Sequence, residues 1–385
     1  MLTSGISFVN FNKKNKSLRL GRNLQSIIND KNEILNSLSN NYRDSYKKNF
    51  VNKYKVFSNY RVIGMGGSIL GTRTIYEFLK HKIKKNFLFI DNLQSFKKKN
   101  DRTKYLNIVV SKSGNTIETI LNSNILINNS QKSIFITENK KSYLNTLAHK
   151  LKSDIIHHNN YIGGRYSVLS ETGLLPAYLM GINITKLRKN ILNHFLKKNK
   201  SYLKDSSLQL ANFVRKNKVK NIILLNYSPE LNRFLYWLQQ LIAESLGKNK
   251  KGFLPLISKA PTDHHSLLQL YLDGPRDKIF YIFSSELNNK RKIKSTYLSK
   301  NFEYLNNKDF GKIKNSQKNA LLQTFKKNKI PFREFKIKNF SEHTLGELFS
   351  YFMLEIAIIG KLVKINPYDQ PAVEEVKLLT KKLLS

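Results

Sequence analysis

The chain has 385 residues, no cysteine and a formal net charge of +41. This length suffices for two domains of ordinary size, and the lack of thiols excludes disulfides and thiolate metal sites, as is typical of a reducing compartment. We expect a cytoplasmic protein with no signal peptide, because no basic segment followed by an apolar one opens the sequence. We expect no membrane span, because no apolar run approaches about 18 residues.

The positive charge comes from 67 basic against 26 acidic residues. A nucleic-acid partner is one interpretation. The other is a compositional enrichment in Lys and Asn, since the lysines are scattered over loops and helix faces and form no arm or tail. No zinc, RRM-like or homeodomain pattern accompanies them, so we favour the compositional explanation and expect no nucleic-acid partner.

Short apolar runs alternate with amphipathic helices in the first half of the chain. Strands are predicted over 61–66, 87–91, 106–111 and 133–137, and a helix over 68–79. The runs are apolar on both faces, which is typical of a parallel sheet covered by helices on both sides.

The second half repeats this alternation without residue-level similarity to the first. Helices are predicted over 208–217, 230–248 and 264–274, and strands over 221–228, 253–259, 278–285 and 332–339, the last closing the sheet. Two final helices, 343–363 and 372–384, are parted by the Asn-Pro and Gln-Pro steps of NPYDQP. The pattern predicts two α/β sandwiches joined near 185–205, with a C-terminal helix returning to the body.

One strand-to-helix turn carries more polar groups than a helix cap requires. It is VVSKSGNTIET, residues 109–119, where Ser111, Ser113 and Thr116 offer hydroxyls and Lys112 a full charge, while Gly114 lets the backbone approach closely. The following helix adds unpaired N–H groups and a partial positive charge. This combination predicts a phosphate site, although a plain Ser/Thr cap is the simpler alternative.

Two other glycine turns are ambiguous by themselves. Gly64-Met65-Gly66-Gly67-Ser68 fits neither the dinucleotide-binding pattern nor a P-loop, so a ligand contact and a tight packing turn are equally compatible with it. In Gly163-Gly164-Arg165-Tyr166-Ser167 the arginine suits a developing oxyanion, but alone it is better explained as a surface residue.

Six motifs in order resemble one family. They are GMGGSILG, SKSGNTIET, GGRYSVLSETGLLPA, QQLIAESLGK, TDHHSLLQ and NPYDQPAVEEVK. Together they resemble the phosphoglucose isomerase family in its shorter bacterial form. The resemblance implies two sugar-isomerase (SIS) domains, each a three-layer sandwich around a parallel five-stranded sheet, with C-terminal helices. It also implies a cytoplasmic homodimer with a shared active site, a sugar phosphate as substrate, and neither cofactor nor metal.

The implied organisation has four parts. Residues 1–55 would form an N-terminal helical flank, 56–190 the first SIS domain with the phosphate-binding loop, and 200–345 the second SIS domain. Residues 346–385 would be C-terminal helices that complete the active site.

The family also implies a role for individual residues in aldose–ketose isomerisation through a cis-enediol. The phosphate would be held by Ser111, Lys112, Ser113, Thr116, Ser68 and the Gly67 backbone. Glu244 would be the base that moves a proton between C2 and C1, with Gln240 one helical turn earlier on the same face. Without the resemblance, a surface glutamate paired with Lys248 at i+4 is the better explanation of Glu244.

Ring opening is assigned to His265, the second histidine of TDHHS, which the family supplies from the neighbouring subunit; a structural loop histidine is the alternative. Lys377 matches the family's C-terminal lysine near the ring oxygen, and Gln370 a substrate-contacting glutamine. Lys377 also lies in a lysine-rich helix, so only its register with DQP separates it from a surface residue. Arg165 would stabilise the enediolate or hold the water that does so.

The sequence therefore predicts interconversion of glucose 6-phosphate and fructose 6-phosphate. One alternative is isomerisation of another sugar phosphate, such as mannose 6-phosphate or a pentose phosphate. A non-catalytic SIS protein that senses sugar phosphates is the other, but it would not need Glu244, His265 and Lys377 together.

Overall fold

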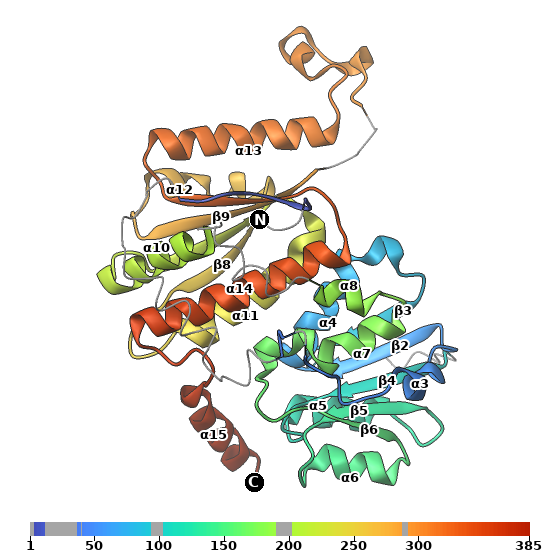
Figure 1. The fold of residues 1–385 in the computed structure, drawn as a ribbon. Helices are drawn as coiled ribbons and strands as arrows, with labels where there is room; N and C mark the ends of the chain where they lie inside the picture. Colours follow the sequence, from blue (N-terminus) through green and yellow to red (C-terminus); the bar gives the residue numbers. More distant parts are fainter. Residues whose placement is uncertain (1–3, 12–36, 40, 94–102, 190–201, 287–291) are drawn as a thin grey trace.

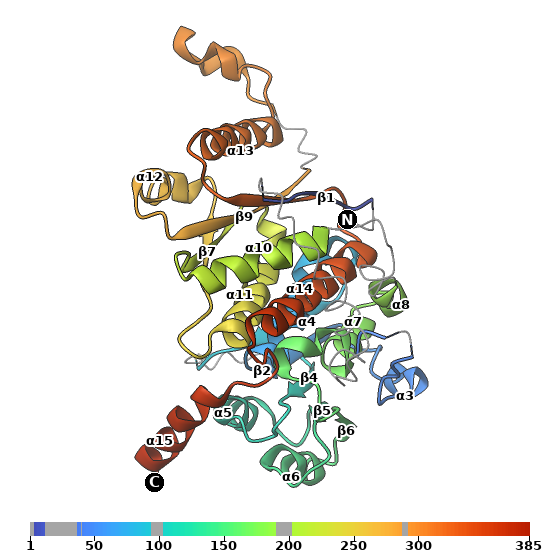
Figure 2. The same ribbon diagram turned by 60° about the vertical axis from the view of Figure 1, so that its left-hand side comes forward.

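The computed structural model describes residues 4–11, 37–39, 41–93, 103–189, 202–286 and 292–385. Two five-stranded sheets occupy separate parts of the molecule (Figure 1). Three helices lie between them, seen from a second direction in Figure 2: α4 (Gly67–Phe78), α11 (Asn232–Leu246) and α14 (Glu342–Val363). The predicted α/β class with two sheets is confirmed.

The first sheet is parallel throughout, in the order β3-β2-β4-β5-β6. Its strands are β2 (Asn59–Gly64), β3 (Asn86–Ile90), β4 (Tyr105–Val110), β5 (Ser133–Thr137) and β6 (Asp154–His157). Alternate residues of β4 enter different cores: Ile108 packs in one cluster and Val109 in another. Both faces are therefore covered, as the continuous apolar runs predict.

The second sheet has the order β1-β10-β9-β7-β8. Its strands are β7 (Asn221–Asn226), β8 (Leu254–Lys259), β9 (Lys278–Ser285), β10 (Phe332–Ile337) and β1 (Ile6–Val9). Strands β10, β9, β7 and β8 are parallel to one another, but β1 pairs antiparallel with β10 at the edge of the sheet. The prediction that both five-stranded sheets are parallel is therefore wrong for the second. Strand β1 precedes all other strands of the second sheet in the chain. No crossover helix therefore connects it to a neighbouring strand and requires it to be parallel.

Two strands escaped the sequence prediction. Both β1 and β6 have only four residues, too short for a clear alternation or apolar run. The prediction that residues 1–55 form a helical flank is wrong at β1, which is a strand. Among the described residues of this segment, the α-helix is the short α3 (Lys48–Asn52). Residues 1–3, 12–36 and 40 of the flank, and 190–201 of the predicted link, lie outside the described residues. The domain boundaries remain predictions.

Eight further α-helices are described. They are α5 (Ile117–Leu126), α6 (Tyr143–Lys150), α7 (Glu171–Leu179), α8 (Ile184–Arg188), α10 (Tyr202–Lys216), α12 (Leu268–Asp273), α13 (Phe310–Lys327) and α15 (Glu374–Leu384). Helix α14 is buried nearly all round because it lies at the centre of the molecule. Helix α15, by contrast, projects from the body and is exposed along its length. In the part of the chain that is described, no helix is long and apolar enough to cross a membrane.

A buried ion pair fixes α14 against the second sheet. Arg333 on β10 donates to both carboxylate oxygens of Glu355 on α14, at 2.6 and 2.7 Å, and both side chains are almost fully buried. The Tyr351 and Ser206 hydroxyls also donate to this carboxylate, at 3.0 and 2.6 Å. The guanidinium carbon lies 3.7 Å from the Tyr281 ring centroid. Two hydroxyl donors and an aromatic face thus stabilise the pair, while Arg333 Nε has no hydrogen-bond partner among the described residues.

Replacing Glu355 with Ala should leave Arg333 as a buried charge without its carboxylate. We expect the free energy of unfolding to fall by about 3–5 kcal/mol, the usual effect of breaking a buried pair, measured by urea unfolding. The matched control is Glu374→Ala, which breaks an ion pair whose side chains are both 62% exposed and should change stability by less than about 1 kcal/mol. Equal losses in the two variants would contradict this account.

Candidate functional site

Two loops meet at the carboxyl edge of the first sheet. Strand β2 leads into α4 and strand β4 into α5, and these strands are neighbours, with Gly64 opposite Val110. The chain reaches β3 on one side of β2 before it returns to β4 on the other, so the gap between the loops is the topological switch point of the sheet. Ligands of parallel α/β proteins bind at such points. The residues predicted to bind phosphate, which lie on both loops, are therefore at the same edge of the sheet.

Residues 111–116, the phosphate loop, form a compact hydroxyl-rich turn. The hydroxyls of Ser111 and Thr116 lie 2.9 Å apart, and Ser113 Oγ accepts from the Asn115 backbone N–H at 3.2 Å. Gly114 has φ +67°, and a Cβ there would lie 2.2 Å from Ser142 Oγ. Only glycine fits this position, because the conformation is left-handed and the neighbouring side chain is already in contact.

Lys112 supplies the loop's charge from a half-buried position. Its ammonium lies 3.6 Å from the Glu138 carboxylate, which also pairs with Lys140. Burial lowers the pKa of Lys112, Glu138 opposes that shift, and the charges of Lys140 and Arg165 add to it.

Arg165 is the centre of the second part of the site. It belongs to the 3₁₀ helix Gly164–Leu169 and its side chain is 1% exposed. The Nε donates to Ser245 Oγ at 2.8 Å, and Nη1 donates to Glu244 at 3.0 Å and Gln370 Oε1 at 2.7 Å. The Nη2 donates to the carbonyls of Pro367 and Asp369, at 2.8 and 2.9 Å. All five N–H groups of this guanidinium are therefore in use.

Glu244 reaches this arginine from the last turn of α11. One carboxylate oxygen accepts from Arg165, and the other accepts from Gln240 Nε2 at 2.7 Å. The carboxylate is 35% exposed, so it has access to solvent or ligand. The alternative pairing of Glu244 with Lys248 is wrong, because Lys248 donates instead to Asp369 at 2.5 Å and to the Asn366 carbonyl.

The glycines of GMGGS allow α4 to approach the arginine segment. A Cβ on Gly67 would lie 2.2 Å from the carbonyl carbon of Gly164, and one on Gly66 would lie 3.1 Å from Gln240 Nε2. The N-terminus of α4 is thus packed against Arg165's own turn and beside the residues of α11. The alternative of a packing turn is correct for Gly67, and that packing also places the N–H groups of α4 at the site.

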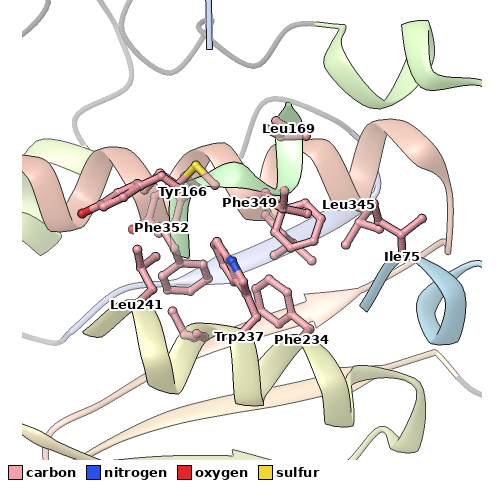
Figure 3. Packing of buried hydrophobic residues seen from close by; sticks show 14 of the residues in the cluster. Ile75, Tyr166, Leu169, Phe234, Trp237, Leu241, Leu345, Phe349 and Phe352 are labelled. Atoms are coloured by element: carbon pink, nitrogen blue, oxygen red, sulfur yellow. The ribbon is translucent and has the colours of Figure 1, made fainter. Parts of the chain in front are cut away.

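Buried aromatic residues, shown in Figure 3, support the Arg165 segment. Trp237, fully buried on α11, donates its indole N–H to the Arg165 carbonyl at 3.1 Å. The Tyr166 hydroxyl lies 3.0 Å from Ser245 Oγ and donates to the Pro367 carbonyl at 3.0 Å. Burial raises the pKa of Tyr166, so the hydroxyl stays a donor. The backbone and side chain of Arg165 are therefore both held in place.

Lys377 lies on α15, away from the Arg165 cluster. Its side chain is 62% exposed and donates to Glu374 at 2.6 Å. A cleft of about 910 Å³ separates α15 from the phosphate loop, and Ser113, Thr116 and Lys377 all line it. The structure thus brings Lys377 to the same cleft as two of the predicted phosphate ligands, with no direct bond to them among the described contacts.

His265 does not join these groups within one chain. It is exposed after the turn Thr262–His264, beyond the carboxyl end of β8. Helix α11 runs back from the carboxyl end of β7, so Glu244 lies toward the amino edge of the same sheet. The two edges are separated by about 20 Å, the length of a six-residue strand. His264 is instead bound to the Tyr227 hydroxyl at 2.8 Å.

The sequence analysis missed several groups that hold Arg165. They are Ser245, Tyr166, Trp237, Lys248 and the carbonyls of Pro367 and Asp369. Backbone carbonyls leave no sequence signal, but the Asn-Pro and Gln-Pro steps did mark a segment of fixed geometry. Among the described residues, no group of three His, Asp or Glu side chains is arranged to hold a metal ion.

Comparison with known proteins agrees with this architecture. The family model for phosphoglucose isomerase matches residues 12–385. The glucose-6-phosphate isomerase of Methanocaldococcus jannaschii is 33% identical over 367 residues, with 89% of each chain covered. That of Campylobacter jejuni is 30% identical over 360 residues, with 87% of each chain covered.

Solved structures share the fold. A hypothetical protein from Thermus thermophilus superposes with a TM-score of 0.76 at 22% identity, covering 97% of this chain and 92% of that one. A glucose-6-phosphate isomerase from Chlamydia trachomatis gives 0.70 at 16% identity, covering 99% and 88%. The two-sheet fold, with its loops gathered at a switch point, is that of the phosphosugar isomerases. Within that class, the chain belongs to the phosphoglucose isomerase family.

Proposed function

We propose that this chain interconverts glucose 6-phosphate and fructose 6-phosphate, the step that glycolysis and gluconeogenesis share, in the cytoplasm. The observation that carries the proposal is the contact of a solvent-accessible Glu244 with a fully bonded, buried Arg165 beside the phosphate-loop edge. A coupled assay with glucose 6-phosphate, fructose 6-phosphate and mannose 6-phosphate tests it. Turnover of the mannose compound alone would overturn it.

The phosphate group binds at the switch point. In the proposal it is held by the hydroxyls of Ser111, Ser113 and Thr116, the Ser68 side chain, the Gly67 backbone and the Lys112 charge, on two loops that follow neighbouring strands. Holding the unreactive end of the sugar fixes C1 and C2 against the catalytic groups, so binding energy from a remote contact lowers the barrier of the chemical step.

Glu244 is the base in this proposal. It removes the proton from C2 and returns it to C1, because its two oxygens can face adjacent carbons. Gln240 and Arg165 each bind one oxygen and so fix the carboxylate plane. Since all five N–H groups of Arg165 are already bonded, its positive charge stabilises the enediolate through its field, without a further hydrogen bond. Gln370, which accepts from the same guanidinium, would contact the substrate.

Ring opening is assigned to His265 and Lys377. His265 lies at the opposite edge of its own sheet from Glu244, so the proposal requires a homodimer in which each subunit lends its histidine to the other's site. Lys377 lines the cleft above the phosphate loop and would act near the ring oxygen.

Replacing Glu244 with Gln should lower kcat by about 10²–10⁴-fold, the usual contribution of a positioned acid–base group. KM should change little, because the amide keeps the size of the carboxylate. Steady-state kinetics and the loss of solvent hydrogen incorporation at C2 measure this. Glu303→Gln, at an exposed position far along the chain, is the control with expected normal rates. Near-normal turnover in Glu244→Gln would exclude Glu244 as the base.

Substrate affinity should depend on pH through Lys112. Because burial lowers its pKa, the cation is lost below the ordinary lysine value of about 10.4, and KM should rise as the pH is raised through that lowered range. Lys112→Ala should raise KM at every pH, and Lys112→Arg should give a flatter profile because arginine stays charged. Kinetics between about pH 8 and about pH 10 measure the effect. Identical profiles in all three proteins would contradict the phosphate role.

Mixing two inactive variants tests the shared active site. Glu244→Gln and His265→Ala are each expected to be inactive alone. After subunit exchange, a mixed dimer keeps one intact site, so about a quarter of all sites should be active at equal amounts if the pairing is random. No recovery after verified exchange would show that His265 acts within its own subunit or not at all.

A further inference from the structure

A second pocket lies apart from the proposed active site, between the segment before α3 and the helix α8. It has a volume of about 430 Å³. Tyr42, Asp44, Tyr46 and Lys48 line one side, and Arg188 and Lys189 the other. This size is within the range of small-molecule sites, and none of the residues proposed for catalysis or phosphate binding lines it.

Two polar atoms of this pocket have no partner among the described residues. Tyr46 is 8% exposed and its hydroxyl makes no hydrogen bond, and neither does Oδ1 of Asp44. A buried polar group without a partner is costly, and folded proteins rarely leave one. Here a donor and an acceptor stand unsatisfied on the same wall, two residues apart in sequence.

The charges of the lining residues indicate the charge of the ligand. The lining contains four cations, Arg43, Lys48, Arg188 and Lys189, and a single carboxylate, Asp44. Burial raises the pKa of Asp44 to about 6 and lowers the pKa of Arg188. Arg188 donates to two neutral carbonyls, those of Leu169 and Ser39, at 2.5 and 2.9 Å. The lining therefore carries a net positive charge, part of which Asp44 and the nearby Glu171 offset at Arg188.

We propose that this pocket binds a small phosphorylated polyol, independently of the substrate site. The phosphate would pair with Lys48, Lys189 and Arg188. The hydroxyls of the ligand would donate to Asp44 Oδ1 and accept from the Tyr46 hydroxyl. An anion without a hydroxyl, such as sulfate, would satisfy the cations but would leave the Asp44 acceptor without a donor, so the hydroxyls are part of the recognition.

The pocket also has a direct link to the proposed active site. The Leu169 carbonyl that accepts from Arg188 ends the same 3₁₀ helix that carries Arg165. One hydrogen bond thus joins the pocket wall to the element that orients Glu244.

Calorimetric titration of the full chain with sn-glycerol 3-phosphate tests the proposal. Tyr46→Phe removes one hydroxyl with little change in shape and should weaken binding by about 3–10-fold. The matched control is Tyr271→Phe on α12, since Tyr271 is equally buried at 6% exposure, and it should bind like the parent. Glycerol and inorganic phosphate, titrated separately, should each bind at least about tenfold more weakly than the joined compound.

Lys112→Ala separates the two anion sites. If the proposal is correct, Lys112→Ala still shows the binding heat that the Tyr46→Phe substitution weakens. It is overturned if Lys112→Ala abolishes all binding while Tyr46→Phe binds normally, because the probe then occupies only the phosphate loop. It is also overturned if millimolar probe gives no heat, since water alone would then satisfy the pocket, or if inorganic phosphate binds as well as the phosphorylated polyol.

Discussion

The arrangement of the site depends on one requirement: the buried guanidinium of Arg165 must have every N–H bonded and its charge balanced. A lone cation removed from water is destabilising by several kcal/mol. Glu244 supplies the balancing charge, and the Pro367 and Asp369 carbonyls, Ser245 and Gln370 supply the remaining acceptors. These groups come from α11 and from the segment before α15. Satisfying one side chain therefore brings together segments that are distant in sequence.

In the proposed function, the phosphate anchor and the reaction centre lie on different elements. The anchor uses backbone and hydroxyl donors at the edge of the first sheet, which a regular parallel sheet provides. The reaction centre needs a carboxylate of fixed orientation, which Arg165 and Gln240 provide from both sides. Helix α4 connects the two, because its N-terminal glycines touch both the arginine turn and Gln240. A shift of α4 would disturb anchor and base together.

The sequence was informative where one local property decides the structure. Apolar runs buried on both faces identified most strands, and the hydroxyl-rich turn after β4 led to the prediction of a phosphate site. Four-residue β1 and β6 carry too little signal, and the direction of β1 depends on a partner more than 300 residues away. For the site, Glu244 and Gln370 were found through the family resemblance. Ser245, Lys248 and the carbonyls were missed because their roles arise only when three segments meet.

The composition makes acidic residues more informative than basic ones in this chain. With 67 cations against 26 carboxylates, a lysine or arginine is expected almost anywhere, so Lys112 and Arg165 are distinguished only by position. A buried carboxylate, in contrast, has been kept against both the composition and the cost of desolvation. Glu355 fixes α14 and Glu138 faces Lys112 from buried positions, and Glu244, which is 35% exposed, balances the buried Arg165. Among the described residues, Asp44 Oδ1 is a buried carboxylate oxygen without a hydrogen-bond partner, and in our proposal it belongs to a second binding site and not to a structural ion pair.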